Sequence, residues 1–341
     1  MSHKTKRIVR AVVGGILALA FLYLAFRNVK FAELLDSVLR VNVFWVFVLV
    51  PVGLAGHWIR AVRWAYLLAP VKSNISTRNL FSAVMIGYMI NNILPRVGEL
   101  VRPYVIGKLE GISKSSAFGS VVAERIIDMV SFFFIMCLVF FVYPNSLDPF
   151  VDDPAMARPL FLIGSVVAMI LFVALFLKID VLWKIVGLIH PLLPRRFESR
   201  IDGIVQSFVS GFAVSKMPEK FAPLAATSFL LWIVYALGLY IAFFAFDPIA
   251  ELGLGFGASV VLLVMSALAF ILPAPGAFGT YHSFLTLALV RLYGVNDVTA
   301  LSYTILTHEL GYVVVMVVGV YYFLKDNFKV SEVRLEVARE T

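Results

Sequence analysis

Cysteine is almost absent from this sequence of 341 residues, which contains one, Cys137, in the middle of an apolar run. A single cysteine excludes an intrachain disulfide and a cluster of cysteine metal ligands. Charged residues are also scarce: they make up 15% of the chain, against about 25% in an average soluble domain. No soluble domain is left once the apolar runs are removed, so we expect one integral membrane domain over residues 1–341.

The common catalytic motifs are missing as well. The sequence has neither a phosphate-binding Gly/Lys loop nor a Gly-x-Ser-x-Gly elbow, and it has no dense group of aspartates that would hold magnesium. "THELGY", which contains His308 and Glu309, begins like a zinc-protease helix but lacks the second histidine. We therefore expect no enzyme, no metal site and no cofactor. The net charge of +8 is interpreted as a topology signal, so no nucleic-acid partner is expected.

Long apolar runs are what the sequence has in abundance. Hydrophobic residues make up 61% of the chain, and runs of about 18 residues or more are long enough to cross a hydrocarbon layer of about 30 Å. Two further apolar regions, 80–112 and 252–292, are broken near their middle by "LPRVGE" and "LPAPGAFG". The fold class predicted is an all-α polytopic membrane protein with about six full spans plus two inverted re-entrant helical hairpins. The six spans lie near 8–26, 43–59, 117–143, 160–177, 221–246 and 298–324.

Basic residues favour a topology with both chain ends in the cytoplasm. The N-terminal "MSHKTKRIVR" precedes an apolar run without a small-residue cleavage site, so we interpret that run as an uncleaved first span. With the N-terminus inside, most Lys and Arg residues of the loops fall on the cytoplasmic side; the loop with Arg27, Lys30 and Arg40 is the exception. This topology requires each broken region to enter and leave on one side of the membrane. We therefore expect a multi-pass protein of the plasma (inner) membrane whose first hairpin dips in from the cytoplasm and whose second dips in from outside.

The two broken regions resemble each other. "ILPRVG" at 93–98 matches "ILPAPG" at 271–276, and a glutamate, Glu124 or Glu309, follows in the next apolar helix. Weak similarity between halves of opposite orientation is typical of inverted-repeat transporters, whose substrate site lies at the repeat interface. The predicted organisation is a first half, 1–143, a cytoplasmic amphipathic connector, 181–220, and a second half, 221–325.

The connector is predicted from "RRFESRIDGIVQSFVSGFAVSK", in which apolar residues recur at helical spacing and basic residues stand at both ends. It is too polar to span a membrane. A helix lying on the cytoplasmic surface is one interpretation, and a soluble helical loop packed on itself is the other.

Ionisable residues inside the apolar regions are few, and each is a candidate for function because a charge at the bilayer centre costs at least about 2.5 to 3.5 kcal/mol. Glu99 and Arg102 are three residues apart and Glu124 and Asp128 four apart, so each pair shares a helix face. An ion-paired cluster of Arg102 with Glu124 or Asp128 is therefore feasible, either as a structural clamp or as the lining of a groove for a lipid headgroup. The candidate substrate-binding residues are Asn92, Arg96, Glu99, Arg102, Glu124, Arg125, Asp128, His282 and Glu309, and the hairpin tips contain Pro95, Gly98, Pro273, Pro275, Gly276 and Gly279.

The hairpin tips offer a second kind of binding group. A broken helix exposes backbone N–H groups at the start of its second half, and such ends favour anions. We expect Gly98 and Gly276 to let a headgroup approach closely. Asn91 and Asn92 either cap the first break or contact substrate. His282 is a weak candidate, because a satisfied interior histidine is an equally good interpretation.

Two arginines outside these regions are expected to be structural. Arg60 and Arg63 stand in "HWIRAVRW", between Trp58 and Trp64, at the predicted cytoplasmic end of the second span. Long basic side chains and tryptophans gather at membrane interfaces. We therefore expect both arginines to extend to the cytoplasmic interface.

These motifs resemble a known family. "NNILPRVGELVRPYVIGKLEGISKSSAFGSVVAERIIDMV" resembles the first signature of the lysylphosphatidylglycerol synthase transmembrane, or flippase-like, family. "LPAPGAFGTYHSFLTLALVRLYGV" resembles its second signature, Leu-Pro-x-Pro-Gly-x-x-Gly, and the resemblance covers essentially the whole chain. The residues that match the family motifs are Asn92, Pro95, Gly98, Glu99, Arg102, Glu124, Arg125 and Asp128 in the first half and Pro273, Pro275, Gly276 and Gly279 in the second.

The resemblance implies lipid transport. Two-part members of the family move aminoacylated phosphatidylglycerol between leaflets with their membrane part, and a separate soluble domain makes that lipid. This chain ends at Thr341 without such a domain, so the resemblance implies a standalone member that translocates and does not synthesise. A membrane lipid is the expected partner, while a homo-oligomer and a separate lipid-synthesising enzyme are left open.

We predict a flippase-like protein that moves a phospholipid or another polar-headgroup lipid between leaflets. Arg102 and Arg125 would hold phosphate, while Glu124 and Asp128 would balance these arginines or bind a cationic headgroup. One alternative is an intramembrane enzyme acting on lipid-linked substrates, against which the scarcity of His and Asp pairs argues. The other is a secondary transporter of ions or small solutes that uses the same inverted hairpins.

Overall fold

Helices account for nearly all of the chain that the structure describes. The computed structural model describes residues 16, 19–27, 29–94, 96–178, 206, 209–272 and 274–329, with only the backbone of Leu147 and Pro275. Its elements are α2 (Phe31–Leu39), α3 (Val43–Leu68), α4 (Thr77–Ile93), α5 (Gly98–Glu110), α6 (Lys114–Val142), η1 (Pro144–Phe150), α7 (Pro154–Leu177), η3 (Ala213–Lys216), η4 (Pro218–Lys220), α10 (Phe221–Phe243), α11 (Asp247–Ala250), α12 (Phe256–Ile271), η5 (Pro275–Ala277), α13 (Thr280–Tyr293) and α14 (Asp297–Lys325). No strand occurs in these residues, and the predicted all-α fold is confirmed.

Five helices of the described chain are long and apolar enough to cross a membrane: α3, α6, α7, α14, and α10 together with the turn before it, Pro218–Phe243. They correspond to five of the six predicted spans, which confirms a polytopic membrane fold. The sixth, near 8–26, lies largely outside the described residues. The most apolar of the five is α7, and only 6% of its most apolar window is buried in the protein, so its surface faces lipid.

The predicted connector, 181–220, also lies mostly outside the described residues, since only residue 206 and residues 209–220 are described. In that short part, Phe212 is fully buried in the core of the first half. Gly211 packs directly on the backbone of α6, where a Cβ would overlap the carbonyl oxygen of Ser116.

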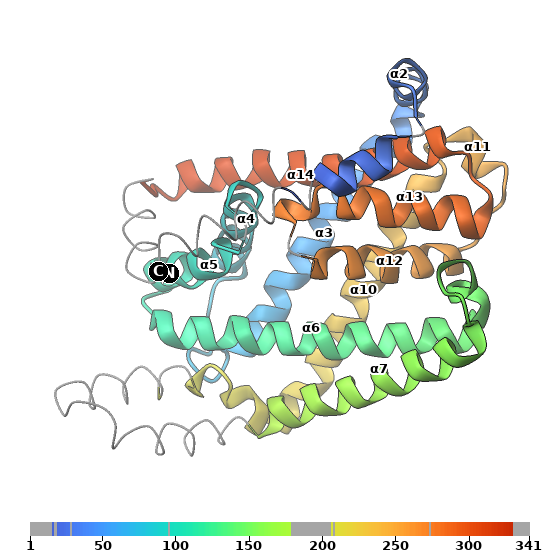
Figure 1. Ribbon diagram of the computed structural model, residues 1–341. Coiled ribbons are helices and arrows are strands. Elements are labelled where there is room, and N and C mark those ends of the chain that lie inside the picture. Colours follow the sequence, from blue (N-terminus) through green and yellow to red (C-terminus); the bar gives the residue numbers. More distant parts are fainter. Residues whose placement is uncertain are drawn as a thin grey trace, which may run out of the picture.

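Each half of the described chain has its own apolar core. Side chains from α3, α4, α5 and α6 pack into one core, and side chains from α10, α12, α13 and α14 pack into the other. Figure 1 shows α6 and α7 running side by side along one edge, while α3 and α10 pack along each other and cross the other helices obliquely. Contacts of α14 with α4 and of α3 with α10 join the two halves.

The two halves use the same local signals to end and restart their helices. In each, two shorter helices precede a helix of 29 residues, α6 or α14. The second short helix ends at Gly111 or at Gly294, each with φ of 68°, a conformation that glycine adopts without strain. Two residues later, the side chain of Ser113 or Asn296 accepts a backbone hydrogen bond and caps the long helix. The orientation of the halves in a membrane stays a prediction.

The two helix breaks meet beside the middle of α14. The first lies between α4 and α5, and the second lies between α12 and α13, where the Leu-Pro motifs predict them. At the first break, Tyr312 donates its hydroxyl to the backbone oxygen of Asn92 at 2.7 Å. At the second, the backbone oxygen of Gly276 lies 2.9 Å from His308 Nε2. Because Tyr312 and His308 are one helical turn apart on α14, the two breaks are neighbours in the fold.

Gly98 allows α4 and α5 to pack with their backbones in contact, since a Cβ there would overlap the carbonyl oxygen of Gly87. We expect Gly98→Ala to lower the free energy of unfolding by about 1–3 kcal/mol, as overpacking does. The measurement is the midpoint of thermal unfolding in detergent. Gly164→Ala is the control, because no atom lies within 4 Å of a Cβ at that position. Equal midpoints for the two variants would contradict the expectation.

Candidate functional site

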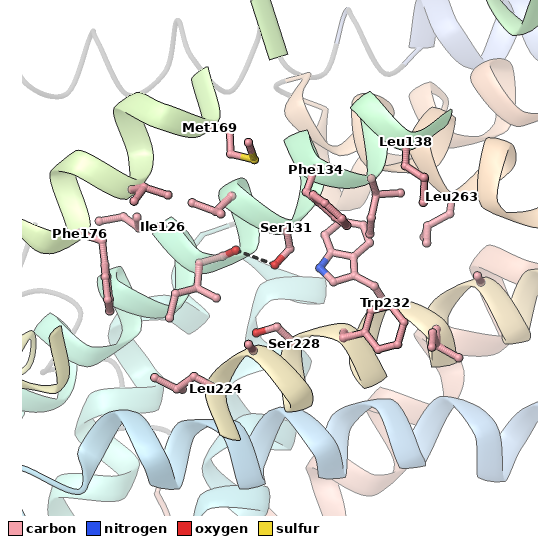
Figure 2. Close-up of a pocket in the computed structure, with 18 of the residues that line it drawn as sticks. Ile126, Ser131, Phe134, Leu138, Met169, Phe176, Leu224, Ser228, Trp232 and Leu263 are labelled. Atoms are coloured by element: carbon pink, nitrogen blue, oxygen red, sulfur yellow. Dashed lines mark hydrogen bonds between the residues drawn. The ribbon is translucent and has the colours of Figure 1, made fainter. Parts of the chain in front are cut away.

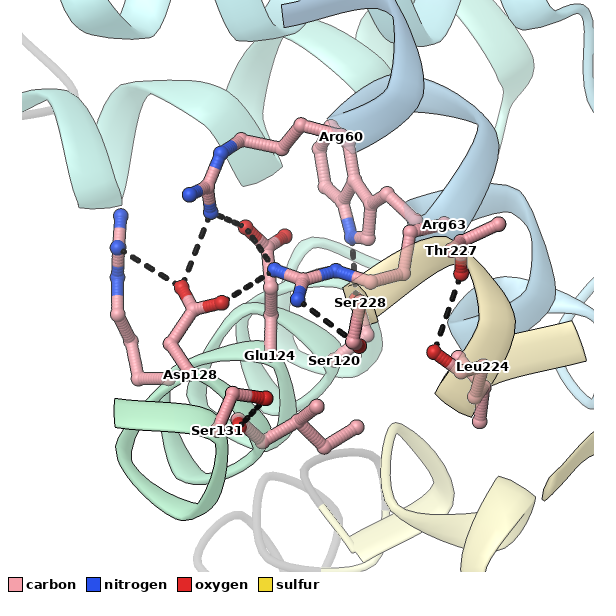
Figure 3. A network of polar contacts seen from close by, with 12 residues as sticks. Arg60, Arg63, Ser120, Glu124, Asp128, Ser131, Leu224, Thr227 and Ser228 are labelled. Atoms are coloured by element: carbon pink, nitrogen blue, oxygen red, sulfur yellow. Dashed lines mark hydrogen bonds and ion pairs between the residues drawn. The ribbon is translucent and has the colours of Figure 1, made fainter. Parts of the chain in front are cut away.

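Seven charged side chains from three helices meet inside the first half, and we name this group the charged cluster. Its members are Arg60 and Arg63 of α3, Glu99 and Arg102 of α5, and Glu124, Arg125 and Asp128 of α6. Four guanidinium groups face three carboxylates, so the cluster has a net charge of +1. Figure 3 shows the part of the cluster around Arg60, Arg63, Glu124 and Asp128. A buried site with excess positive charge favours an anion.

Glu124 is the most enclosed acid of the charged cluster, and its side chain is fully buried. Arg102 Nη2 lies 2.9 Å from Glu124 Oε2, so the predicted ion pair between these residues is present. On the other carboxylate oxygen, Arg60 donates a hydrogen bond and Arg63 Nη2 lies at 3.5 Å. Three arginines from two other helices therefore neutralise this one carboxylate, as a buried charge requires.

Asp128, one helical turn after Glu124, connects the buried and the exposed parts of the cluster. Its Oδ1 accepts a hydrogen bond from Arg63 Nη2 at 2.6 Å, and its Oδ2 accepts one from Arg60 Nη1 at 3.0 Å. Arg125 Nη1 lies 3.4 Å from the same Oδ2, and Arg125 Nε lies 3.1 Å from a carboxylate oxygen of Glu99. The side chains of Arg125 and Glu99 are 31% and 38% exposed, so this pair forms the accessible edge of the cluster.

Neutral side chains fix the buried arginines in place. Arg60 Nη2 donates to the hydroxyl of Tyr235 at 2.9 Å, and Arg63 Nη1 donates to Ser228 Oγ at 3.2 Å, both on α10. The guanidinium carbon of Arg102 lies 4.3 Å from the ring centroid of Trp64, within cation–π range. Helix α10 thus brings the second half of the chain into contact with the charges of the first.

Three of these arginines keep an unused donor. The Nε–H groups of Arg60, Arg63 and Arg102 are buried and have no hydrogen-bond partner among the described residues. A buried donor without a partner loses its hydration without replacement. An oxygen-rich ligand or ordered water entering the cluster would satisfy such donors.

The expectation for Arg60 and Arg63 is wrong, because neither reaches an interface. Their side chains are 6% and 0% exposed and pair with Glu124 and Asp128. Trp64 is fully buried as well, whereas Trp58 is 45% exposed. One signal in the sequence could have indicated this: nothing in "HWIRAVRWAYLL" ends a helix, so α3 continues to Leu68 and carries both arginines into the protein.

At the first tip, the asparagines cap the break. Asn91 Oδ1 accepts a hydrogen bond from the backbone N–H of Gly98 at 2.7 Å, so that N–H does not face an anion in this structure. Asn92 Nδ2 donates to the backbone oxygen of Tyr312 at 3.4 Å. Arg96 is exposed at the tip, with a positive φ of 69° that is unusual for a residue other than glycine. Pro95 and Pro273, predicted for the two tips, lie outside the described residues.

The remaining two predicted residues belong to a different group, which we name the histidine cluster. His282 of α13 lies with its Nε2 3.7 Å from Glu309 Oε1, and His308 of α14 lies with its Nδ1 3.0 Å from the same oxygen. The residues Gly276 and Gly279 form the backbone turn next to this cluster, with φ of 57° and 81°. The sequence indicated His282 and Glu309 as candidate residues, but it did not predict that they lie next to His308.

An apolar cavity of about 780 Å³ opens beside the charged cluster, between α6, α7, α10 and α12. Figure 2 shows Ser228 and Ser131 on its wall among Phe134, Trp232 and other apolar side chains. Ser131 donates its hydroxyl to the backbone oxygen of Ile127 at 2.9 Å. Ser228 instead accepts a hydrogen bond from Arg63, so it connects the cavity wall to the charged cluster.

Most of the chain matches one family. A family model described as the lysylphosphatidylglycerol synthase TM region matches residues 9–319. The chain belongs to this family. The match includes all seven residues of the charged cluster, both helix breaks and the histidine cluster.

The relatives of this chain include two UPF0104 membrane proteins and a glycosyltransferase. A UPF0104 membrane protein of Methanothermobacter thermautotrophicus is 25% identical over 335 residues, which cover 94% of this chain and 95% of the relative. A UPF0104 membrane protein of Pyrococcus horikoshii is 25% identical over 347 residues, which cover 94% and 98%. Glycosyltransferase AglD of Haloferax volcanii is 26% identical over 307 residues, which cover 80% of this chain and 47% of that protein, so the chain spans about half of its length.

Proposed function

We propose that this protein moves a phospholipid or another lipid with an anionic headgroup between the leaflets of the membrane. The observation that carries the proposal is the apolar cavity of about 780 Å³ that contacts the charged cluster through Ser228. A lipid needs both parts at once: an apolar space for its chains and a polar site for its headgroup.

The headgroup would bind at the accessible edge of the charged cluster. The cluster carries one positive charge in excess, and guanidinium groups bind phosphate oxygens through two parallel hydrogen bonds. Arg102 was predicted to share this task, but its side chain is 1% exposed and paired with Glu124. We therefore assign the first contact with phosphate to Arg125, while Glu124 and Asp128 balance the buried arginines.

The acyl chains would lie in the cavity and reach the bilayer directly. Several of its lining residues, including Phe134, Leu138, Leu177 and Phe229, have side chains between 46% and 66% exposed. Only 6% of the most apolar window of the neighbouring α7 is buried, so the cavity borders a surface that would face lipid, and the chains need not leave the hydrocarbon while the headgroup crosses. The geometry thus favours lateral entry.

The predicted membrane arrangement belongs to this proposal. The matching order of elements in the two halves and the meeting of both breaks beside α14 support two re-entrant hairpins of opposite orientation around a central site. Cytoplasmic termini, a plasma-membrane location and a separate enzyme that supplies the lipid are proposed with it.

Lipid exchange in proteoliposomes tests the proposal. Fluorescent phospholipid is placed in both leaflets, and an impermeant quencher reports its movement. We expect the wild type to exchange the lipid. With Ala225→Trp we expect the rate to fall to that of protein-free liposomes, because Ala225 lines the cavity and a tryptophan would fill it. Ala226→Trp is the control, since the next residue of α10 is also exposed but does not line the cavity.

Two outcomes contradict the proposal: equal loss in both tryptophan variants, or no exchange of phospholipids, lysyl-lipids or polyprenyl carriers by the wild type.

The name of AglD favours a second candidate, sugar transfer to a lipid. A changed lipid mass after incubation of the protein with lipid and sugar donors would support it.

A further inference from the structure

The histidine cluster brings three metal-ligating side chains together at the second helix break. His282 comes from α13, and His308 and Glu309 come from α14. One donor atom from each lies within 4.8 Å of the other two. Both histidines are buried, with 3% and 9% exposure, whereas the side chain of Glu309 is 37% exposed.

The contacts of His308 require a positive charge between its ring and Glu309. His308 Nε2 lies 2.9 Å from the carbonyl oxygen of Gly276, which can only accept, so Nε2 carries the hydrogen. In the neutral ring, Nδ1 then presents a lone pair to Glu309 Oε1 at 3.0 Å. Two acceptors at that distance repel each other unless a positive charge lies between them.

His282 adds a second unsatisfied ring to the same oxygen. Its Nε2 lies 3.7 Å from Glu309 Oε1, beyond hydrogen-bonding distance. Its Nδ1 is buried without a hydrogen-bond partner in the part of the chain that the structure describes. Two imidazoles from different helices thus lie next to one carboxylate oxygen.

We propose that His282 Nε2, His308 Nδ1 and a carboxylate oxygen of Glu309 bind a divalent transition-metal ion of the zinc class. Bonds of about 2.0–2.2 Å in a tetrahedral site place the donor atoms about 3.3–3.6 Å apart. The distances from the two histidine nitrogens to Glu309 Oε1, 3.0 and 3.7 Å, bracket that range. The hydrogen bond from His308 Nε2 to a backbone carbonyl is the outer contact that usually orients a metal-bound histidine.

The surroundings leave one side of this site open. The ring of Phe278 stacks on His282 at an interplanar angle of 19°, and the ring of Tyr281 lies 4.9 Å from that of His308. These rings exclude water from the histidine side, while the exposed Glu309 leaves a fourth coordination position for water or an anionic oxygen. Three protein ligands and one open position are typical of zinc sites that bind a further ligand. The prediction of no metal site at "THELGY" is based on residues of one helix, whereas the second histidine of this site comes from α13.

Zinc binding to the purified protein tests this site without any transport assay. The protein, free of affinity tag and treated with chelator, is titrated with Zn²⁺ in detergent, and bound metal is counted by elemental analysis. We expect one zinc per chain for the wild type and a higher midpoint of thermal unfolding with zinc than without. His282→Ala and Glu309→Gln should lose both effects, whereas the control His57→Ala should keep them, since His57 is a partly buried histidine of α3 whose ring lies 5.0 Å from that of Tyr88.

Glu309→Gln keeps the test decisive if a histidine variant does not fold, because its side chain is partly exposed and the amide has the same shape as the carboxylate. Absence of saturable zinc binding by the wild type overturns the proposal. The positive charge between His308 and Glu309 would then be a proton. Unchanged binding by Glu309→Gln and His282→Ala overturns it too, since the zinc would then lie elsewhere. Loss of lipid exchange does not bear on either outcome.

Discussion

Glu124→Gln is expected to lower the free energy of unfolding by about 3–5 kcal/mol, the cost of removing one partner from a buried ion pair. The carboxylate is fully buried and contacts Arg60, Arg63 and Arg102. Glutamine keeps the shape of the side chain but replaces the charge by an amide, whose NH₂ group would face guanidinium donors. The charged cluster would then hold four positive charges against two negative ones, and the burial of Arg60, Arg63 and Arg102 limits their screening by solvent.

The measurement is unfolding in mixed detergent and lipid micelles, followed by tryptophan fluorescence. Glu33→Gln is the control, since Glu33 pairs with Lys30 on an exposed surface, with side chains 51% and 83% exposed. Such a pair contributes at most about 1 kcal/mol. A loss of less than 1 kcal/mol for Glu124→Gln would show that the cluster tolerates an unbalanced charge, and its role in holding α3, α5 and α6 together would have to be abandoned.

The sequence predicts those features of this fold that depend on local signals. Leu-Pro motifs mark both helix breaks, and the spacing of Glu124 and Asp128 places both acids on one face of α6. Glycine and polar caps mark the turns before α6 and α14. Each of these signals lies within a few residues of the structure that it specifies, because backbone conformation and helix faces are set by neighbouring residues.

Contacts between distant helices could not be predicted in the same way. Arg60 and Glu124 are 64 residues apart, and no local pattern pairs α3 with α6. The same holds for His282 and His308, which stand on different helices and meet only because α13 packs on α14. The cavity is likewise formed by four helices that are far apart in the sequence, α6, α7, α10 and α12.

Arg125→Gln is expected to reduce the exchange of anionic phospholipids by about tenfold to a hundredfold, because a hydrogen bond to a charged group contributes about 1.5–3 kcal/mol. Arg125 has the most exposed arginine side chain of the charged cluster, at 31%, against 6% or less for Arg60, Arg63 and Arg102. It is therefore the arginine that an entering phosphate meets first. The substitution also removes the excess positive charge of the cluster. Its partner Glu99 is half-exposed, so the fold should survive.

Arg158→Gln is the matched control for this prediction. The side chain of Arg158, on α7, is 34% exposed and pairs with Asp148 of η1, outside the charged cluster, so its loss should leave exchange unchanged. The double variant Arg125→Gln with Glu99→Gln then separates two explanations. It restores the net charge of +1 without restoring the guanidinium, so recovered exchange would mean that overall charge attracts the lipid. Exchange that stays low would mean that Arg125 itself binds the phosphate, as we expect from the directed geometry of an arginine–phosphate contact. Equal rates for Arg125→Gln and the wild type would instead move the headgroup site away from this edge of the cluster.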